Sequence, residues 1–209
     1  MTTFWDRVAG LYDHVFSPRF WAERQFAIAQ GVAGRTLEAC CGTGKLTQYL
    51  MEQGVDVYAI DMSPRMVSKA RERLASAGLD PGRLLVADVR RLPFSDESFD
   101  YVLVTGTLGL LKAQDVRTAI AEMYRLSRKE VRLLEPLEKQ EGFYPGRIRT
   151  LMFDGMHPIS KSVFADLGLD YHLEWRAIMD VFSYLRVFKQ RRDNEPPPSG
   201  QSTREVSND

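Results

Sequence analysis

The sequence predicts an α/β fold, in which helices pack on both faces of a mostly parallel β-sheet. Short apolar segments alternate with amphipathic segments of helical length between residues 35 and 135, and turn residues separate many of them. Strands that alternate with such helices favour parallel pairing and right-handed crossover connections. The pattern changes after Pro136, where two strand-like segments follow each other near the C-terminal end. These observations predict a parallel sheet that ends in an antiparallel pair.

The first part of the alternating region supplies two strands and three helices. Serine is a favourable N-cap and proline suits the first helical position, so Ser63-Pro64 predicts the start of the third helix, which runs to Gly78. The earlier helices have apolar groups at helical spacing and end at glycines. The predicted order is a helix over residues 20–31, a strand over 35–40, a helix over 44–53 and a strand over 55–60.

The remaining elements complete a seven-stranded sheet. Two strands separated by only a few residues predict an antiparallel hairpin at the C-terminal side. Together the elements form a doubly wound, mostly parallel, Rossmann-like sheet with that hairpin at its end. The further strands are expected over residues 83–87, 99–104, 131–135, 171–177 and 181–188, and the further helices over 113–127 and 160–167.

We expect one domain over residues 1–189, because a chain of 209 residues buries a sizeable core. Within it, residues 1–34 form a leader and helix, and residues 136–158 form a segment rich in turns and aromatic side chains. Residues 190–209 contain one large apolar residue, Val206, and cannot offset the entropy of ordering, so they are predicted to be a disordered tail.

Composition narrows the classes of function. The chain has 28 basic and 28 acidic residues, so no electrostatic footprint for nucleic acid or an anionic membrane is expected. No secretory signal or transmembrane segment is recognised. The adjacent Cys40 and Cys41 match no zinc spacing, and we predict no metal site and two free thiols in a reducing cytoplasm. A cytoplasmic protein is therefore expected.

Three polar features follow three consecutive predicted strands. Gly42 and Gly44 come after the first, Asp61 ends the second and Asp88 ends the third. Ligands of doubly wound sheets lie beyond the carboxyl ends of the strands, where glycine amides and a ribose-binding carboxylate are useful. A tight turn and two helix caps remain the alternative. The dinucleotide fingerprint requires a glycine where this chain has Thr47, which disfavours NAD and favours S-adenosylmethionine.

At this point the sequence resembles a known family. The segments TLEACCGTG, VYAIDMSPRMVSKARERL, LLVADVRRLPFSDESFDYVLV and EMYRLSRKEVRLLEP are similar to the successive motifs of class I S-adenosylmethionine-dependent methyltransferases. The similarity is closest to the small-molecule group that includes ubiquinone/menaquinone and phospholipid methyltransferases. The leader WDRVAGLYD resembles the leader of that group, and the resemblance covers residues 4–136.

The resemblance implies a set of contacts with S-adenosylmethionine. Backbone around Glu38, Cys40, Gly42 and Gly44 holds the methionine moiety, together with Thr105 and with Tyr12 closing over that end. Asp61 binds the ribose diol, and Met62 packs on the adenine. Asp88 accepts from the adenine amino group, and the Val89 amide reaches the ring.

The chain departs from the family pattern in three places. Cys40 replaces a usual glycine, and its side chain either narrows the pocket or points into the core. The loop before the fifth strand, residues 127–130, lacks the usual glycine and proline. A common His-His pair after the fourth strand is absent from residues 106–111.

Methyl transfer from a sulfonium is an in-line displacement that depends mainly on orientation, and a general base is needed only if the acceptor loses a proton. No single diagnostic catalytic residue is therefore expected. An apolar acceptor pocket from Phe143, Tyr144, Met152, Phe153 and Met156 is a hypothesis, and covering the sheet is its alternative. The candidates for an acceptor-side role are Tyr12, His14, Tyr144, Arg147, Asp154, His157 and Tyr171, whereas His172 is interpreted as structural.

Three functions compete. The first is a methyltransferase acting on a small molecule, for which an apolar acceptor is the hypothesis given above. The second is an S-adenosylmethionine-binding protein of the same fold without transferase activity, in a regulatory or partner role. The third is an NAD-dependent enzyme, against which Thr47 and Asp88 argue. The sequence does not specify the acceptor or the oligomeric state.

Overall fold

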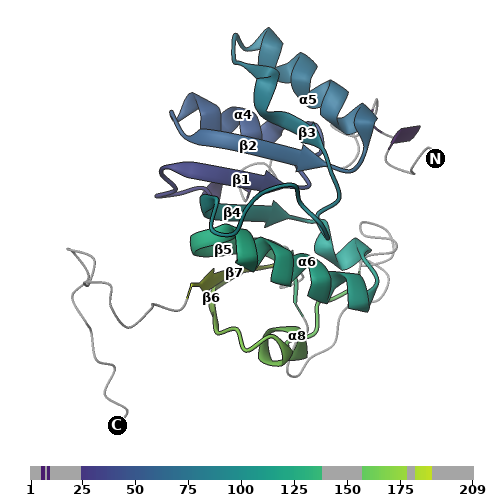
Figure 1. Cartoon of the computed structure of the whole chain (residues 1–209), viewed down its shortest axis with the longest axis vertical. Helices are drawn as coiled ribbons and strands as arrows, with labels where there is room; N and C mark the ends of the chain where they lie inside the picture. Colours follow the sequence, from purple (N-terminus) through teal and green to yellow (C-terminus); the bar gives the residue numbers. More distant parts are fainter. Residues whose placement is uncertain (1–5, 8, 10–24, 138–156, 178–181, 190–209) are drawn as a thin grey trace.

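A computed structural model describes residues 6, 7, 9, 25–137, 157–177 and 182–189 of the chain. They contain seven strands that form one sheet (Figure 1). The strands are β1 (Arg35–Ala39), β2 (Asp56–Asp61), β3 (Leu84–Val86), β4 (Phe99–Thr105), β5 (Ser127–Pro136), β6 (Tyr171–Ala177) and β7 (Phe182–Phe188). The helices are α4 (Lys45–Glu52), α5 (Pro64–Ser76), α6 (Ala113–Leu126) and α8 (Ser162–Asp166), with two 3₁₀ turns, η1 (Pro81–Arg83) and η2 (Leu108–Leu110).

The strand order is β3-β2-β1-β4-β5-β7-β6. Strands β1 to β5 pair in parallel, whereas β7 pairs antiparallel with both β5 and β6. The predicted mostly parallel sheet with a C-terminal antiparallel hairpin is confirmed. The strand order reverses between β1 and β4, and such a switch point leaves a crevice at the carboxyl ends of the two strands.

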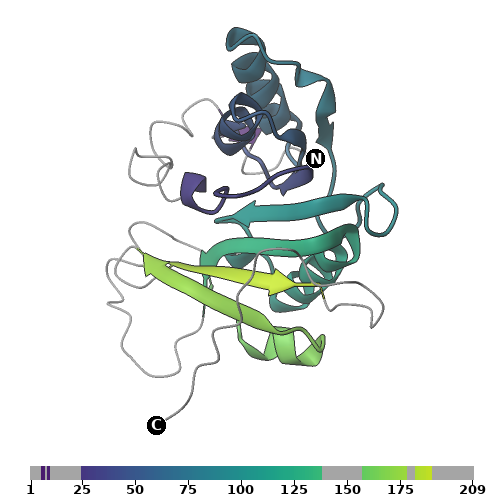
Figure 2. The ribbon, with the colours of Figure 1, turned by 90° about the vertical axis from the view of Figure 1, so that its left-hand side faces the viewer.

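Helices pack on both faces of this sheet (Figures 1 and 2). The largest core cluster joins α6 and Phe164 of α8 to side chains of β1, β4 and β5. A second cluster joins α4 and Ile28 to Leu103 and Leu134, which point to the other face. Apolar positions on alternate sides of these strands therefore bury both faces.

The start of α5 forms as its sequence predicts. Ser63 is the N-cap, and its hydroxyl accepts a hydrogen bond from the Met66 amide at 3.2 Å. Pro64 occupies the first helical position. The cap also sets the direction in which the chain leaves β2, because the Ser63 amide donates to the Asp61 carboxylate at 2.9 Å. A local sequence signal thus positions a polar residue at the end of a strand.

The prediction that the fifth strand begins at residue 131 is wrong. Strand β5 begins at Ser127, directly after the last residue of α6. The backbone turns from helical to extended at Ser127, with φ −81° and ψ 141°, so no separate loop is needed. Glu130 then pairs with Tyr101 and with Phe188. Residues 127–130 belong to the strand and form no turn, so they need neither glycine nor proline.

The first predicted helix, residues 20–31, is described only from Gln25 onward. Residues 25–27 are helical and residues 28–31 form turns. Arg132 of β5 attaches this end to the sheet, because its Nη1 donates to the carbonyl oxygens of Ile28 at 2.8 Å and Gln30 at 2.6 Å. The predicted tail, residues 190–209, lies outside the described residues.

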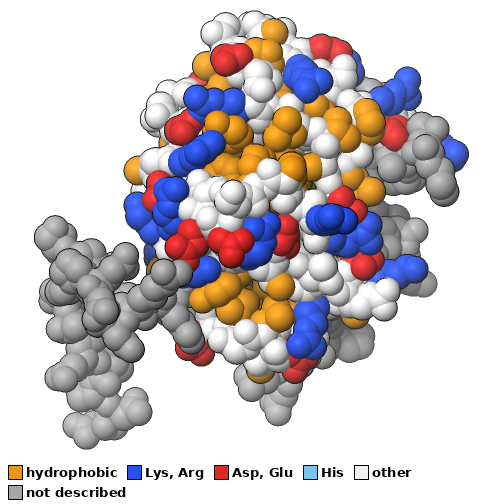
Figure 3. Space-filling view, in the orientation of Figure 1, with side chains coloured by type: hydrophobic (Ala, Val, Ile, Leu, Met, Phe, Trp, Pro, Cys, Tyr) orange, Lys and Arg blue, Asp and Glu red, His pale blue; other side chains and the backbone are white. Residues whose placement is uncertain are grey.

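Charges of both signs alternate over the face of the molecule seen in Figure 3, and neither sign gathers into a large patch on the described residues of that face. None of the described helices has the length and apolar content that crossing a membrane requires.

Candidate functional site

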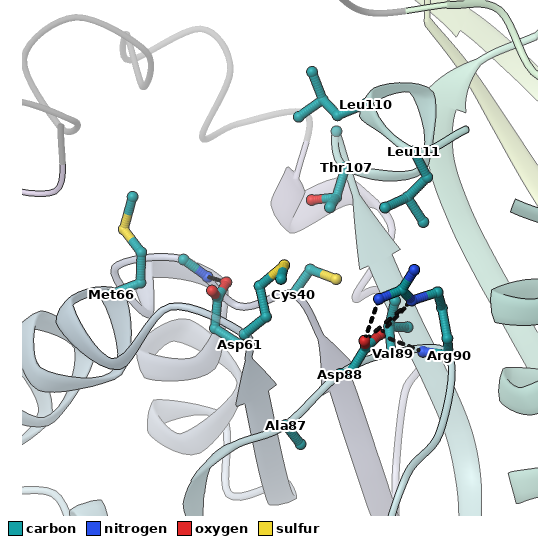
Figure 4. A pocket seen from close by; sticks show the side chains of 13 residues that line it. Cys40, Asp61, Met66, Ala87, Asp88, Val89, Arg90, Thr107, Leu110 and Leu111 are labelled. Atoms are coloured by element: carbon teal, nitrogen blue, oxygen red, sulfur yellow. Dashed lines mark hydrogen bonds and ion pairs between the residues drawn. The ribbon is translucent and has the colours of Figure 1, made fainter. Parts of the chain in front are cut away.

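A cavity of about 270 Å³ lies at the carboxyl ends of the parallel strands, beside the switch point between β1 and β4 (Figure 4). Its lining comes from the turns that follow β1, β2 and β4 and from the residues after β3. Six of the residues predicted to bind S-adenosylmethionine line it together: Cys40, Gly42, Asp61, Met62, Asp88 and Val89.

Three predicted contacts lie next to the cavity without lining it. Gly44 is the N-cap of α4, and Glu38 is buried within β1. Thr105 ends β4, where its hydroxyl accepts a hydrogen bond from Gln25 Nε2 at 2.8 Å. The predicted role of these three residues in binding the methionine moiety stays a prediction.

Most acceptor-side candidates fall outside the described part of the chain. These are Tyr12, His14, Tyr144, Arg147 and Asp154, together with the apolar candidates Phe143, Met152, Phe153 and Met156. His157 is described and exposed, and its amide donates to the Gly109 carbonyl oxygen at 2.6 Å. Tyr171 and His172 lie in β6, beside a separate open groove with Arg186 and Phe188.

The turn after β1 depends on backbone conformations that favour glycine. Gly42 has φ 53° and Gly44 has φ 78°, both in the left-handed region. A Cβ atom on Gly44 would lie 2.8 Å from Ala70 Cβ, so the glycine also allows α4 and α5 to approach closely. The turn brings the Gly42 amide to 2.9 Å from Asp61 Oδ2.

Cys40 is a half-buried residue in the left-handed region, with φ 59°. Cys40 lines the cavity and also packs against the largest core cluster, so it contacts both regions that the sequence left open. Burial raises the pKa of the Cys40 thiol well above its ordinary value, and the carboxylates of Asp61, Glu135, Asp88 and Glu38 add to this effect. The thiol therefore stays protonated and uncharged near neutral pH.

Asp61 holds a fixed carboxylate at the end of β2. One oxygen accepts from the Gly42 amide and the other from the Ser63 amide, each at 2.9 Å. Burial raises the pKa of Asp61, while these two hydrogen bonds act in the opposite direction. Each oxygen retains a lone pair, so the side chain can accept two further hydrogen bonds from a ligand in the cavity.

A residue of the leader supports the same turn. Asp6 Oδ1 accepts from the Ser63 hydroxyl at 2.5 Å, and the Asp6 carbonyl oxygen accepts from Arg65 Nη1 at 2.9 Å. Sequence reasoning did not identify Asp6 as a site residue, although it lies in the leader motif WDRVAGLYD. The leader is thereby attached to the turn that follows β2.

Glu135 supports the opposite wall of the cavity. Its side chain is fully buried at the end of β5 and accepts from the Thr107 amide at 2.8 Å and the Gly109 amide at 3.3 Å. Burial raises the pKa of Glu135 to about 7, against the effect of these backbone hydrogen bonds. Thr107, Leu110 and Leu111 of the supported segment line the cavity. The sequence analysis missed Glu135, and its position at the end of a predicted strand was the available signal.

Glu38 lies beneath the glycine turn with 3% of its surface exposed, and the Thr47 hydroxyl donates to it. Burial raises its pKa from 4.5 to about 8. Because the folded protein binds this proton more tightly than the unfolded chain does, the stabilisation is complete below pH 4.5. It is lost as the pH rises from about 4.5 to about 8.

We expect Glu38→Gln to remove this pH dependence. The free energy of unfolding of the variant minus that of the original protein should be about 2–4 kcal/mol larger at pH 8.5 than at pH 5. Urea denaturation at both pH values measures the difference. The Thr47 hydroxyl can donate to the amide oxygen, so the variant keeps a partner there. Parallel pH profiles for the two proteins would contradict the raised pKa.

Comparison with known proteins agrees with this geometry. A family described as "Methyltransferase domain" matches residues 36–130, which span the sheet from β1 into β5. The malonyl-[acyl-carrier protein] O-methyltransferase of Salmonella typhimurium is 35% identical over 105 residues, 50% of this chain and 36% of that protein. Residues 36–130 are a methyltransferase domain of the S-adenosylmethionine-dependent class.

Two further proteins are similar to this chain. The demethylmenaquinone methyltransferase of Geobacillus kaustophilus is 34% identical over 98 residues, 45% of this chain and 41% of that protein. Magnesium protoporphyrin IX methyltransferase from Synechocystis, solved with S-adenosylmethionine bound, has a TM-score of 0.57 at 17% identity. That comparison covers 91% of this chain and 86% of the other, and it shows the shared fold. The matched regions span less than half the length of the two curated relatives.

Proposed function

We propose that the protein transfers a methyl group from S-adenosylmethionine to a small molecule. The observation that carries the proposal is the fixed carboxylate of Asp61, which faces the cavity below the glycine turn, with Asp88 lining the same cavity. A carboxylate at the end of the second strand is suited to bind a ribose diol. The methyltransferase domain and the relatives named above support this assignment.

The residues of the cavity fit the parts of S-adenosylmethionine. Asp61 has acceptor capacity for the ribose hydroxyls, and the Met62 side chain, 47% exposed, offers an apolar surface for the nucleobase. Val89 supplies a backbone amide on the nucleobase side, while Cys40 and Gly42 lie on the methionine side of the proposed position. We assign the cofactor to this cavity on these grounds.

The electrostatic surroundings also suit a cation. Asp61 and Asp88 line the cavity, and the charges of both act on the Cys40 thiol. The buried Glu38, whose pKa is raised by burial to about 8, is largely uncharged near neutral pH and does not add to this charge. Negative charge at a cavity wall stabilises a positively charged ligand when water is partly excluded. A sulfonium with an adjacent ammonium group matches this field.

The chemistry that the cofactor supplies is a methyl group already activated by positive charge. The protein has to orient an acceptor on the axis of the bond that breaks and to keep water away. Orientation of this kind can lower the barrier by as much as about 7–11 kcal/mol. Met66, Leu110 and Leu111 give the described wall of the cavity an apolar character, which disfavours water. A general base is required only for an acceptor that loses a proton.

We further propose that the acceptor is apolar. The relatives are named for demethylmenaquinone and for a malonyl-acyl carrier protein, which supports a small or carrier-bound acceptor. Leu110 and Leu111, on the wall supported by Glu135, favour apolar contact. The acceptor-side candidates of residues 136–158 fall mostly outside the described residues and do not enter this argument.

The experiment combines binding with transfer. Calorimetry with S-adenosylmethionine, S-adenosylhomocysteine and NAD is expected to show binding of the first two only. Incubation with methyl-labelled S-adenosylmethionine and fractionated cell extract is then expected to place the label in the organic phase. Binding without any label transfer would favour the alternative, a cofactor-binding protein without transferase activity. Label confined to polar products would reject the apolar acceptor.

A further inference from the structure

The rim of the cavity carries an arginine that pairs with a proposed cofactor contact. Arg90 Nε lies 3.0 Å from each carboxylate oxygen of Asp88, and Arg90 Nη2 lies 2.6 Å from Oδ2. The Arg90 amide donates to Oδ1 at 3.0 Å. Three N–H groups of Arg90 thus bind the two oxygens of Asp88, with the Nε–H shared between them, and they occupy most of the acceptor capacity of this carboxylate.

The same guanidinium has a second acidic partner. Arg90 Nη1 lies 3.1 Å from Oδ2 of Asp115, which belongs to the first turn of α6. The side chains of Arg90 and Asp88 are 40% and 39% exposed, and ion pairs with this exposure separate at low cost. Figure 4 shows the Arg90 and Asp88 side chains pointing toward each other beside Val89. The guanidinium can leave Asp88 and keep a carboxylate partner at Asp115.

We propose that Arg90 competes with the nucleobase amino group of S-adenosylmethionine for the Asp88 carboxylate, and that Asp115 holds the guanidinium after it is displaced. The proposal rests on the proposed position of the adenine beside Asp88. Cofactor affinity then depends on the fraction of time for which the Arg90 guanidinium pairs with Asp88 and not with Asp115. Removing Arg90 frees Asp88, whereas removing the charge of Asp115 leaves Arg90 on Asp88 for more of the time. The two changes have opposite effects on affinity.

Calorimetry with S-adenosylhomocysteine tests this competition. Arg90→Ala is expected to bind the ligand about two- to fivefold more tightly than the original protein, and Asp115→Asn about twofold more weakly. The double variant should bind like Arg90→Ala, because Asp115 acts only through the guanidinium. Arg91→Ala is the matched control, since it removes the same charge from an exposed neighbour that does not line the cavity. An equal gain from Arg91→Ala would assign the effect to net charge and reject the proposal.

A second probe isolates the amino group. In S-inosylhomocysteine an oxo group replaces the nucleobase amino group, so this ligand lacks the donor that competes with Arg90 for Asp88. Arg90→Ala is expected to change the dissociation constant of S-inosylhomocysteine by a smaller factor than that of S-adenosylhomocysteine. Equal gains for both ligands, or weaker binding of S-adenosylhomocysteine by Arg90→Ala, would overturn the competition.

Asp88→Ala separates this proposal from the proposed cofactor position. If that variant binds S-adenosylhomocysteine as well as the original protein does, the nucleobase lies elsewhere, and both the proposed nucleobase position and the competition fail. If Asp88→Ala binds more weakly but Arg90→Ala shows no gain, the cofactor position stands and the competition is rejected.

Discussion

Asp61→Asn is expected to weaken the binding of S-adenosylmethionine by about 100-fold. The substitution removes the charge and replaces one acceptor oxygen with an NH₂ group, which faces a backbone amide of the turn. Hydrogen bonds to a charged group contribute about 1.5–3 kcal/mol each, and two are expected to the ribose diol. The loss of one or both accounts for an effect of this size. Isothermal titration calorimetry at one pH measures it directly.

Asp56→Asn is the matched control for this prediction. Asp56 lies at the other end of β2, where its exposed side chain pairs with Arg83 and is remote from the cavity lining. This variant should bind the cofactor as the original protein does. Unfolding curves for both variants show whether the fold is retained. If Asp61→Asn and Asp56→Asn bind equally well, the ribose does not contact Asp61.

Gly44→Ala is expected to lower the free energy of unfolding by about 2–4 kcal/mol. The new Cβ would meet Ala70 Cβ at 2.8 Å and Ala70 Cα at 3.2 Å, and the residue has φ 78°. The left-handed conformation costs a residue with a side chain about 1–2 kcal/mol, and overpacking against the α5 backbone adds a cost of similar size. Urea denaturation gives the difference.

Gly54→Ala separates these two contributions. Gly54 has nearly the same conformation, with φ 77°, but a Cβ there has no atom within 4 Å. It should therefore lose only about 1–2 kcal/mol, the conformational part. Equal losses for the two variants would show that the contact of the new Cβ with Ala70 adds no cost.

The sequence predicts the parts of the site that depend on local patterns. The sequence predicts that a strand ends at Asp61 and that Ser63 caps a helix. A short apolar run, an acid and a Ser-Pro pair follow each other there within a few residues. Parallel pairing then brings Asp61 to Gly42, which lies 19 positions away in the sequence. The register of neighbouring strands follows from the fold class and places both residues at one edge.

The contacts that sequence reasoning missed are set by tertiary packing. Glu135 reads as an ordinary residue at the end of a strand, and only the path of the chain after β4 shows that it binds the amides of Thr107 and Gly109. Arg90 is one of two adjacent arginines, and the structure alone shows which of them turns to Asp88. The early start of β5 was missed because no turn residue marks the junction with α6.

Glu135 contacts the segment after β4 through main-chain amides only. Every residue except proline carries such an amide, so this support is indifferent to the side chains at positions 107 to 109. Leu110 and Leu111, which follow directly and line the cavity, take no part in these two hydrogen bonds. The wall that we propose to face the acceptor can therefore change its shape and polarity by substitution while its attachment to the sheet persists. A fold built in this way can acquire new acceptors without rebuilding the part that we propose to hold its methyl donor.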